Sequence, residues 1–180
     1  MHHDLQDSIA VLTHTPGALD ALLRGLPDTW TRHNEGGDSW TVHDILGHLI
    51  HGERTDWIPR AKRILQSGES VTFDSFDMSG HLREVQGKSL GHLLDEFDRL
   101  RSENLRELGA LNLGPGDLER RGRHPSLGIV TLSQLLATWA VHDLTHLHQI
   151  SRVMAYQGRE AVGPWSQYMG VLRCSGHSTV

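Results

Sequence analysis

The chain has 180 residues, of which 37% are hydrophobic and 22% charged, and its formal net charge is -5. These values are typical of a single soluble domain and argue against a disordered or membrane-embedded chain. Cys174 is the only cysteine, which excludes a disulfide scaffold and a cysteine-based zinc site. The negative charge argues against a general binder of nucleic-acid backbones.

The first two predicted helices each contain a proline. Apolar residues recur at helical spacing over about residues 5–24. Pro16 interrupts this pattern, so we expect a helix that is kinked or that begins only near Thr15. The second predicted helix covers about residues 41–66, and we expect Pro59 to bend it.

The third predicted helix covers about residues 89–110, and the fourth, with the clearest apolar stripe, about residues 131–157. Two long connections remain, about residues 67–88 and 111–130. The second could hold a short extended piece, but no segment alternates with period two for long enough to support a sheet. We therefore predict an all-α fold: one domain over residues 1–180, built as a four-helix bundle with at least one long crossover connection.

Histidine is unusually frequent, with 14 copies in the chain. His142 and His146 lie four residues apart in the fourth helix, about 40° apart around its axis, and both face the predicted core. Two inward histidines one turn apart can bind one metal ion. The alternative is a pair of hydrogen-bonded core histidines. His148 faces solvent in the same projection and is not expected to be a ligand.

A third ligand is needed for a metal site, and periodicity does not choose it. The candidates are His43, His48 and His51 in the second helix and His92 in the third. The helical projection leaves His48 on the flank of the apolar stripe. Other metal motifs fit less well, because Asp143 stands where a zinc protease has glutamate, and the chain contains no Glu-x-x-His of the ferritin-like di-metal bundles.

Two blocks of the sequence resemble the DinB/YfiT-like superfamily. Its second-helix signature is similar to SWTVHDILGHLIHGERTDWIPR, and its fourth-helix block, of pattern H-[DE]-x-x-H-x-x-Q-I, is similar to RHPSLGIVTLSQLLATWAVHDLTHLHQISRVMA. The resemblance extends from near Leu5 to about Leu172. It implies a four-helix bundle that holds one divalent ion, nickel or zinc, through three histidines. Carried onto this chain, these are His48, His142 and His146.

The resemblance leaves two classes of function open. Members of the superfamily include transferases and isomerases that depend on the thiols mycothiol or bacillithiol, and many proteins with no known reaction. A three-histidine site with an open position fits an enzyme, either a hydrolase that activates water or a transferase that activates a low-molecular-weight thiol. Cys174, beyond the fourth helix, is not expected to be that thiol. The alternative is a metal-stabilised, stress-related or ligand-binding bundle without turnover.

Two acidic residues are further candidates for the site. Asp143 and Glu53 are predicted to point inward, where each could orient a ligand histidine or act as a base. The alternative for both is an ion pair with a helix-borne arginine such as Arg54 or Arg152.

The chain also allows expectations about location and partners. Its first residues lack the pattern of a signal peptide, and no apolar run reaches the roughly 18 residues of a membrane span. We therefore expect a cytoplasmic protein with a small-molecule substrate and with neither nucleic acid nor membrane as a partner. A homodimer is compatible with the exposed faces of a helical bundle.

Overall fold

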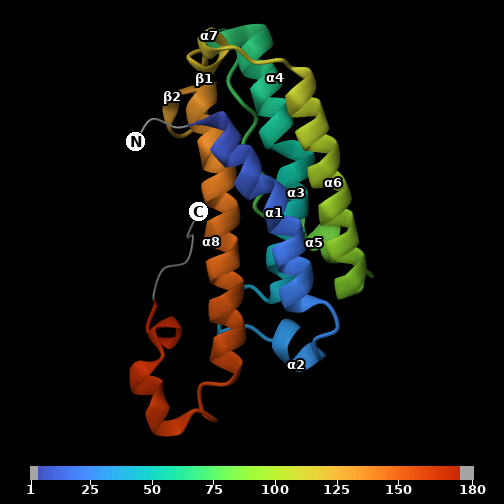
Figure 1. The fold of residues 1–180 in the computed structure, drawn as a ribbon, viewed down its shortest axis with the longest axis vertical. Coiled ribbons are helices and arrows are strands. Elements are labelled where there is room, and N and C mark those ends of the chain that lie inside the picture. Colours follow the sequence, from blue (N-terminus) through green and yellow to red (C-terminus); the bar gives the residue numbers. More distant parts are fainter. Residues whose placement is uncertain (1–3, 175–180) are drawn as a thin grey trace.

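Long helices that lie side by side make up most of the structure, a computed structural model that describes residues 4–174 (Figure 1). The long helices are α1 (Leu5–Leu23), α3 (Val42–Thr55), α4 (Trp57–Ser67), α6 (Leu90–Ala110) and α8 (Leu132–Gln157). The shorter elements are α2 (Asp28–Thr31), α5 (Gly80–Val85), α7 (Pro115–Leu118), strands β1 (Arg121–His124) and β2 (Gly128–Thr131), and 3-10 helices at Gly68–Ser70, Gly163–Tyr168 and Gly170–Leu172. The predicted all-α four-helix bundle is confirmed, with α3 and α4 together forming its second helix.

The direction of the chain explains why two connections are long. Figure 1 shows α1 and α8 running down the bundle, whereas α3, α4 and α6 run up it. Because α4 and α6 point the same way, the chain between them must return along the whole bundle. The short helix α5 lies on this return path and packs against α3. This return path is the predicted crossover connection.

The two helical prolines act differently from each other. Helix α1 is continuous through Pro16. Because proline has no backbone N–H, the Leu12 carbonyl lacks its usual helical donor, and it accepts a hydrogen bond from the buried Arg101 at 2.8 Å instead. Pro59 lies in the first turn of α4, where a missing N–H is tolerated. The break in the second helix therefore falls at Asp56, three residues before the proline that was expected to bend it.

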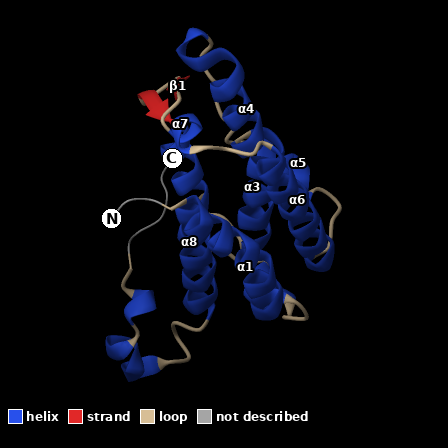
Figure 2. Cartoon of the chain, turned by 45° about the horizontal axis from the view of Figure 1, so that its top comes forward, coloured by secondary structure: helices blue, strands red, loops and turns tan. Residues whose placement is uncertain are grey.

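The connection between α6 and α8 contains a β-hairpin that the sequence did not predict as a sheet. Strands β1 and β2 pair antiparallel, with Arg121 opposite Thr131 and His124 opposite Gly128. Figure 2 shows β1 at one end of an otherwise helical molecule. Each strand has four residues, which is too short for alternation to stand out, but the expected extended piece is present.

A layer of polar side chains divides the apolar core into two clusters. One cluster joins the last turns of α1, the body of α3, the first half of α6 and the last half of α8. The other joins α4, Leu12, Leu108 and the first half of α8. Between them lie buried polar residues of four helices: Thr15, Glu53, Arg101, Asp143, His146 and Gln149. No helix within residues 4–174 has the length and apolar character needed to cross a membrane.

Candidate metal centre

Three histidine rings from α3 and α8 converge at the level of the polar layer. The Nε2 atom of His142 lies 3.0 Å from Nε2 of His48 and 3.1 Å from Nε2 of His146. The ligand atoms of all three rings lie within 4.8 Å of one another. The four-residue spacing in α8 brings His142 and His146 to the same side, and α3 carries His48 to face them.

The geometry and protonation of this triad fit a divalent metal ion. Zinc–nitrogen bonds of about 2.0–2.1 Å at tetrahedral angles place ligand nitrogens roughly 3.3 Å apart, close to the separations seen here. Burial, followed by repulsion from neighbouring histidines, lowers the pKa of His48 to about 3 and that of His142 to about 2. Burial also lowers the pKa of His146. The rings are therefore neutral at physiological pH, as metal ligands must be.

Gln149 fixes the orientation of one ligand ring. Its Oε1 lies 2.8 Å from Nδ1 of His146, so Nδ1 carries the proton and donates it, and the lone pair of Nε2 points into the triad. The Nδ1 atom of His142, by contrast, is buried without a hydrogen-bond partner within the described chain. One of the three ligands is therefore held by a hydrogen bond to its far nitrogen, and the others depend more on packing.

Aromatic rings hold the triad in place from several sides. The Trp40 ring centre lies 5.0 Å from that of His48 and 6.5 Å from that of His146. The Trp57 ring meets the edge of His142 at 5.1 Å. These contacts exclude water from the sides of the triad and restrict the rotation of the imidazoles.

One side of the triad opens into a cavity of about 370 Å³, to which His48 and His142 contribute. A cavity of this size suits a small organic molecule. Its walls are formed by the ends of α3 and α4, the first turns of α8, the 73–78 segment and the hairpin turn. Apolar side chains dominate these walls: Trp57, Phe73, Phe76, Met78, Leu127, Val130 and Leu135.

The two acidic residues predicted near the site both pair with Arg101 instead of with a ligand. Asp143 accepts two hydrogen bonds from the Arg101 guanidinium, at 2.6 and 2.9 Å, and Glu53 accepts one at 2.9 Å. Neither carboxylate lines the cavity. The ion pair considered as the alternative is therefore present, but its partner is neither Arg54 nor Arg152. This arrangement favours a structural role for Asp143 and Glu53.

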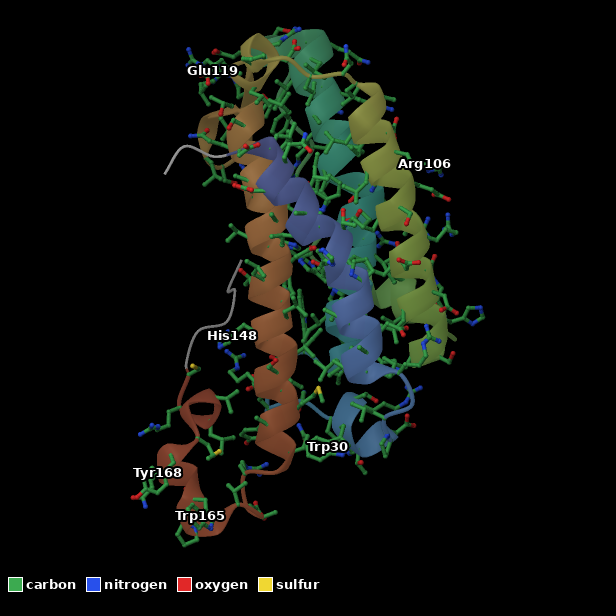
Figure 3. The ribbon with its side chains drawn as sticks, in the orientation of Figure 1. Trp30, Arg106, Glu119, His148, Trp165 and Tyr168 are labelled. Atoms are coloured by element: carbon green, nitrogen blue, oxygen red, sulfur yellow. The ribbon has the colours of Figure 1, made fainter. Side chains whose placement is uncertain are left out.

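The other candidate histidines lie outside the triad. His43 is buried with Nδ1 3.1 Å from the Thr31 carbonyl, and His51 lies 3.7 Å from a carboxylate oxygen of Glu84. His92 is exposed on α6. His148 is exposed on α8, as predicted, and Figure 3 shows it on the side of α8 turned away from the other long helices.

Comparison with known proteins places this fold and site in a family. A family model for the DinB superfamily matches residues 12–150, which is more than half of the chain. The chain belongs to the DinB superfamily. The resemblance noted in its sequence is thus confirmed, and the triad of this DinB protein lies within the matched segment.

A solved structure supports the same fold. YfiT from Bacillus subtilis, described as a probable metal-dependent hydrolase with an unusual four-helix bundle topology, superposes on this DinB chain with a TM-score of 0.72. The two sequences are 21% identical, and the match covers 89% of each chain. The sequence has no significant match among curated proteins.

Several residues around the site were not singled out in the sequence. Gln149 could have been found, because it lies three residues after His146 and therefore on the same face of α8. Arg101 could also have been found, because it follows Phe97 by one turn within the apolar stripe of α6. No local signal pointed to the cavity residues Arg60 and His124. They lie far apart in the sequence, and the connection between α6 and α8 brings His124 to the same cavity as Arg60.

Proposed function

We propose that this protein is a metal-dependent enzyme acting on a small organic molecule, with His48, His142 and His146 as the ligands of one divalent ion. The observation that carries this proposal is the cavity of about 370 Å³ against which two of the three histidines lie. Three neutral imidazoles leave at least one coordination position open, which is typical of catalytic and not of structural zinc sites. The substrate would reach that position from the cavity.

Hydrolysis is the reaction class that we favour. When bound, the ion supplies Lewis-acid activation of a water molecule or of a substrate carbonyl. The chain itself orients the ligands through Gln149 and shields the site through Trp40 and Trp57. The apolar cavity walls hold the substrate body and exclude bulk water. The description of YfiT, a fold relative, as a probable metal-dependent hydrolase agrees with this proposal.

A metal analysis tests the ligand set. Protein purified without an affinity tag is expected to carry close to one divalent ion per chain. Imidazole ligands suit both nickel and zinc, so the same measurement is needed to identify the ion. His48→Ala, His142→Ala and His146→Ala should each lose the ion. His148→Ala removes an exposed histidine from the same helix and should retain it. Full retention of the ion by His48→Ala would contradict the assignment.

Transfer of a low-molecular-weight thiol is the second candidate reaction. The apolar cavity beside the ligands has room for a soft ligand, and zinc and nickel bind thiolates well. Titration of the nickel- or cobalt-substituted protein with small thiols separates the two reactions. A sulfur-to-metal charge-transfer band supports thiol transfer. Its absence counts against thiol transfer and leaves hydrolysis or metal binding without turnover.

A bundle that binds metal without turnover would be expected to close the coordination sphere with a fourth protein ligand. Within residues 4–174, the histidine, cysteine and carboxylate groups that could share one ion with His48 comprise only His142 and His146. The arrangement therefore favours an enzyme over a purely structural metal site.

A further inference from the structure

A second group of polar side chains surrounds Phe73 in the cavity wall, apart from the three metal ligands. The Arg60 guanidinium carbon lies 5.3 Å from the Phe73 ring centre, and the His124 ring meets the same phenylalanine edge-on at 6.2 Å. Arg60 comes from the second turn of α4, and His124 ends strand β1. Both residues line the cavity. A cation and an imidazole thus flank one end of an otherwise apolar space.

His124 presents a hydrogen-bond donor at this end. Its Nδ1 atom accepts hydrogen bonds from the backbone amides of Ser126 and Leu127, each at 3.1 Å. Partial burial and the nearby Arg60 lower the pKa of His124, so the ring is neutral at physiological pH. A neutral imidazole that accepts at Nδ1 must carry its proton at Nε2. The hairpin turn therefore fixes Nε2–H as the free polar group of this ring.

The protein does not use all of the hydrogen-bond donors of Arg60. Its Nε lies 2.6 Å from Asp56 Oδ1, and one terminal nitrogen donates to the Asp74 carbonyl at 3.4 Å. The other terminal nitrogen has no hydrogen-bond partner in the described part of the chain. The side chain is 12% exposed, so it forms part of the cavity wall and does not extend into solvent. The free nitrogen of this buried cation favours an anionic oxygen acceptor.

We infer that this end of the cavity binds the carboxylate of a small organic acid between Arg60 and His124, while the body of the acid extends past Phe76 and Trp57 to the metal ligands. The inference rests on the proposed function in taking the cavity as the substrate site. Phe76 and Trp57 connect the two ends, because their rings contact His48 and His142 respectively, at 5.3 and 5.1 Å. The apolar walls between them suit a hydrocarbon or aromatic body.

Asp56 sets the affinity of this subsite, because it already neutralises part of the charge of Arg60. Burial raises the pKa of Asp56 to about 6, although the attraction of Arg60 opposes this change. As the pH falls through this value, Asp56 takes up a proton and leaves the charge of Arg60 to the ligand. We therefore expect a carboxylate to bind more tightly at pH 6 than at pH 8.

Other charged groups facing this pair keep their state over that range. The pKa of Asp74 is lowered by its hydrogen bond and ion pair with Arg63, so this carboxylate remains ionised. The lowered pKa values of His48 and His142, about 3 and about 2, keep these two rings neutral. Burial and the charge of Arg60 lower the pKa of His124 as well. The variant Asp56→Asn isolates the contribution of Asp56, because it leaves His124 in place.

Calorimetric titration of the full-length protein as purified, with benzoate and with the uncharged benzamide as probes, tests the subsite. Arg60→Gln should weaken benzoate binding roughly 10–100-fold and change benzamide binding much less. Asp56→Asn should strengthen benzoate binding by roughly tenfold and remove its dependence on pH between 6 and 8. The matched control is Arg106→Gln, which removes an exposed arginine that Figure 3 shows on the outer side of α6 and should leave both affinities unchanged.

A milder variant keeps the test valid if Arg60→Gln fails to fold. His124→Asn retains a side-chain oxygen that can accept from the hairpin amides but lacks Nε2–H, and it should weaken benzoate binding severalfold. Equal affinity for benzoate and benzamide, or no effect of Asp56→Asn, would overturn the inference. If the metal content stays near one ion per chain in that case, the proposed function stands without the subsite. Equal affinity for benzoate and benzamide in a purified protein that carries no metal ion would overturn both the subsite and the proposed function.

Discussion

Replacing Arg101 by methionine is expected to destabilise the protein by about 3–5 kcal/mol, because the change leaves buried carboxylates without their cation. Arg101 is 1% exposed, and the side chains of its partners Glu53 and Asp143 are equally hidden. The two carboxylates do not lose the same share of their hydrogen bonds. Glu53 keeps hydrogen bonds from Trp139 at 2.8 Å and Asn104 at 2.9 Å, whereas both oxygens of Asp143 are bonded to Arg101.

The magnitude therefore depends mainly on Asp143. Removing one partner of a buried pair costs about 3–5 kcal/mol, since the remaining charge has no solvent. Arg101→Met also removes the donor to the Leu12 carbonyl, which Pro16 leaves without a helical partner. An unsatisfied buried carbonyl adds roughly 1 kcal/mol or more. The estimate for the single variant thus lies in the upper part of this range.

Urea unfolding measures this loss as a lower midpoint at unchanged slope. The double variant Arg101→Met with Asp143→Leu removes both charges and should recover more than half of the lost stability, because apolar residues often replace a buried ion pair at little cost. Arg106→Met, on the exposed face of the same helix, should stay within about 0.5 kcal/mol of the parent. A loss below about 1 kcal/mol for Arg101→Met, or no recovery in the double variant, would refute the reasoning.

Three further outcomes are expected. Gln149→Leu removes the acceptor at Nδ1 of His146 and should weaken metal affinity roughly 10–100-fold in competition with a chelator, and equal affinity would show that packing alone orients the ring. The metal-free protein should lose about 3 kcal/mol of unfolding free energy between pH 6.5 and 5. The pKa values of His48 and His142 are about 3 and about 2 in the folded protein, so these two histidines take up protons first in the unfolded chain as the pH falls. An unfolding free energy that stays constant over this pH range in urea titrations would contradict the prediction. Gly80→Ala would place a methyl group 2.2 Å from the ring of His51 and should lower stability by about 1–3 kcal/mol in thermal unfolding, whereas Gly109→Ala meets nothing within 4 Å and serves as its control.

Much of the bundle could be predicted from the chain because its long helices carry regular apolar spacing. The α8 pattern also gave the directions of His142 and His146, since both follow from counting 100° per residue along a continuous helix. The same counting left His48 on the flank of α3. It could not show that α8 lies beside that flank, so only the family resemblance pointed to His48.

The features that the sequence did not predict depend on contacts between helices and on the path of the loops. Asp143 and Glu53 were predicted to point inward, with an ion pair to an arginine as the alternative to a role at the metal. Their partner Arg101 lies on a different helix, and no local pattern places α6 across the core from both. The hairpin strands are too short for periodicity, and the cavity end at Arg60 and His124 exists only because the connection folds back onto α4. Such tertiary features do not appear in local patterns.

The two ends of the cavity belong to parts of the chain that are under different constraints. The three histidines of the candidate metal centre lie on long packed helices, where a change of register would move the triad and both apolar clusters together. The opposite wall includes a hairpin turn whose tip, Leu127, is 73% exposed. Insertions or exchanges in such a turn cost the helices little. The shape of this end of the cavity can therefore change while the histidine triad keeps its geometry. Under the proposed function, exchanging the 125–127 turn is a direct way to redirect substrate preference.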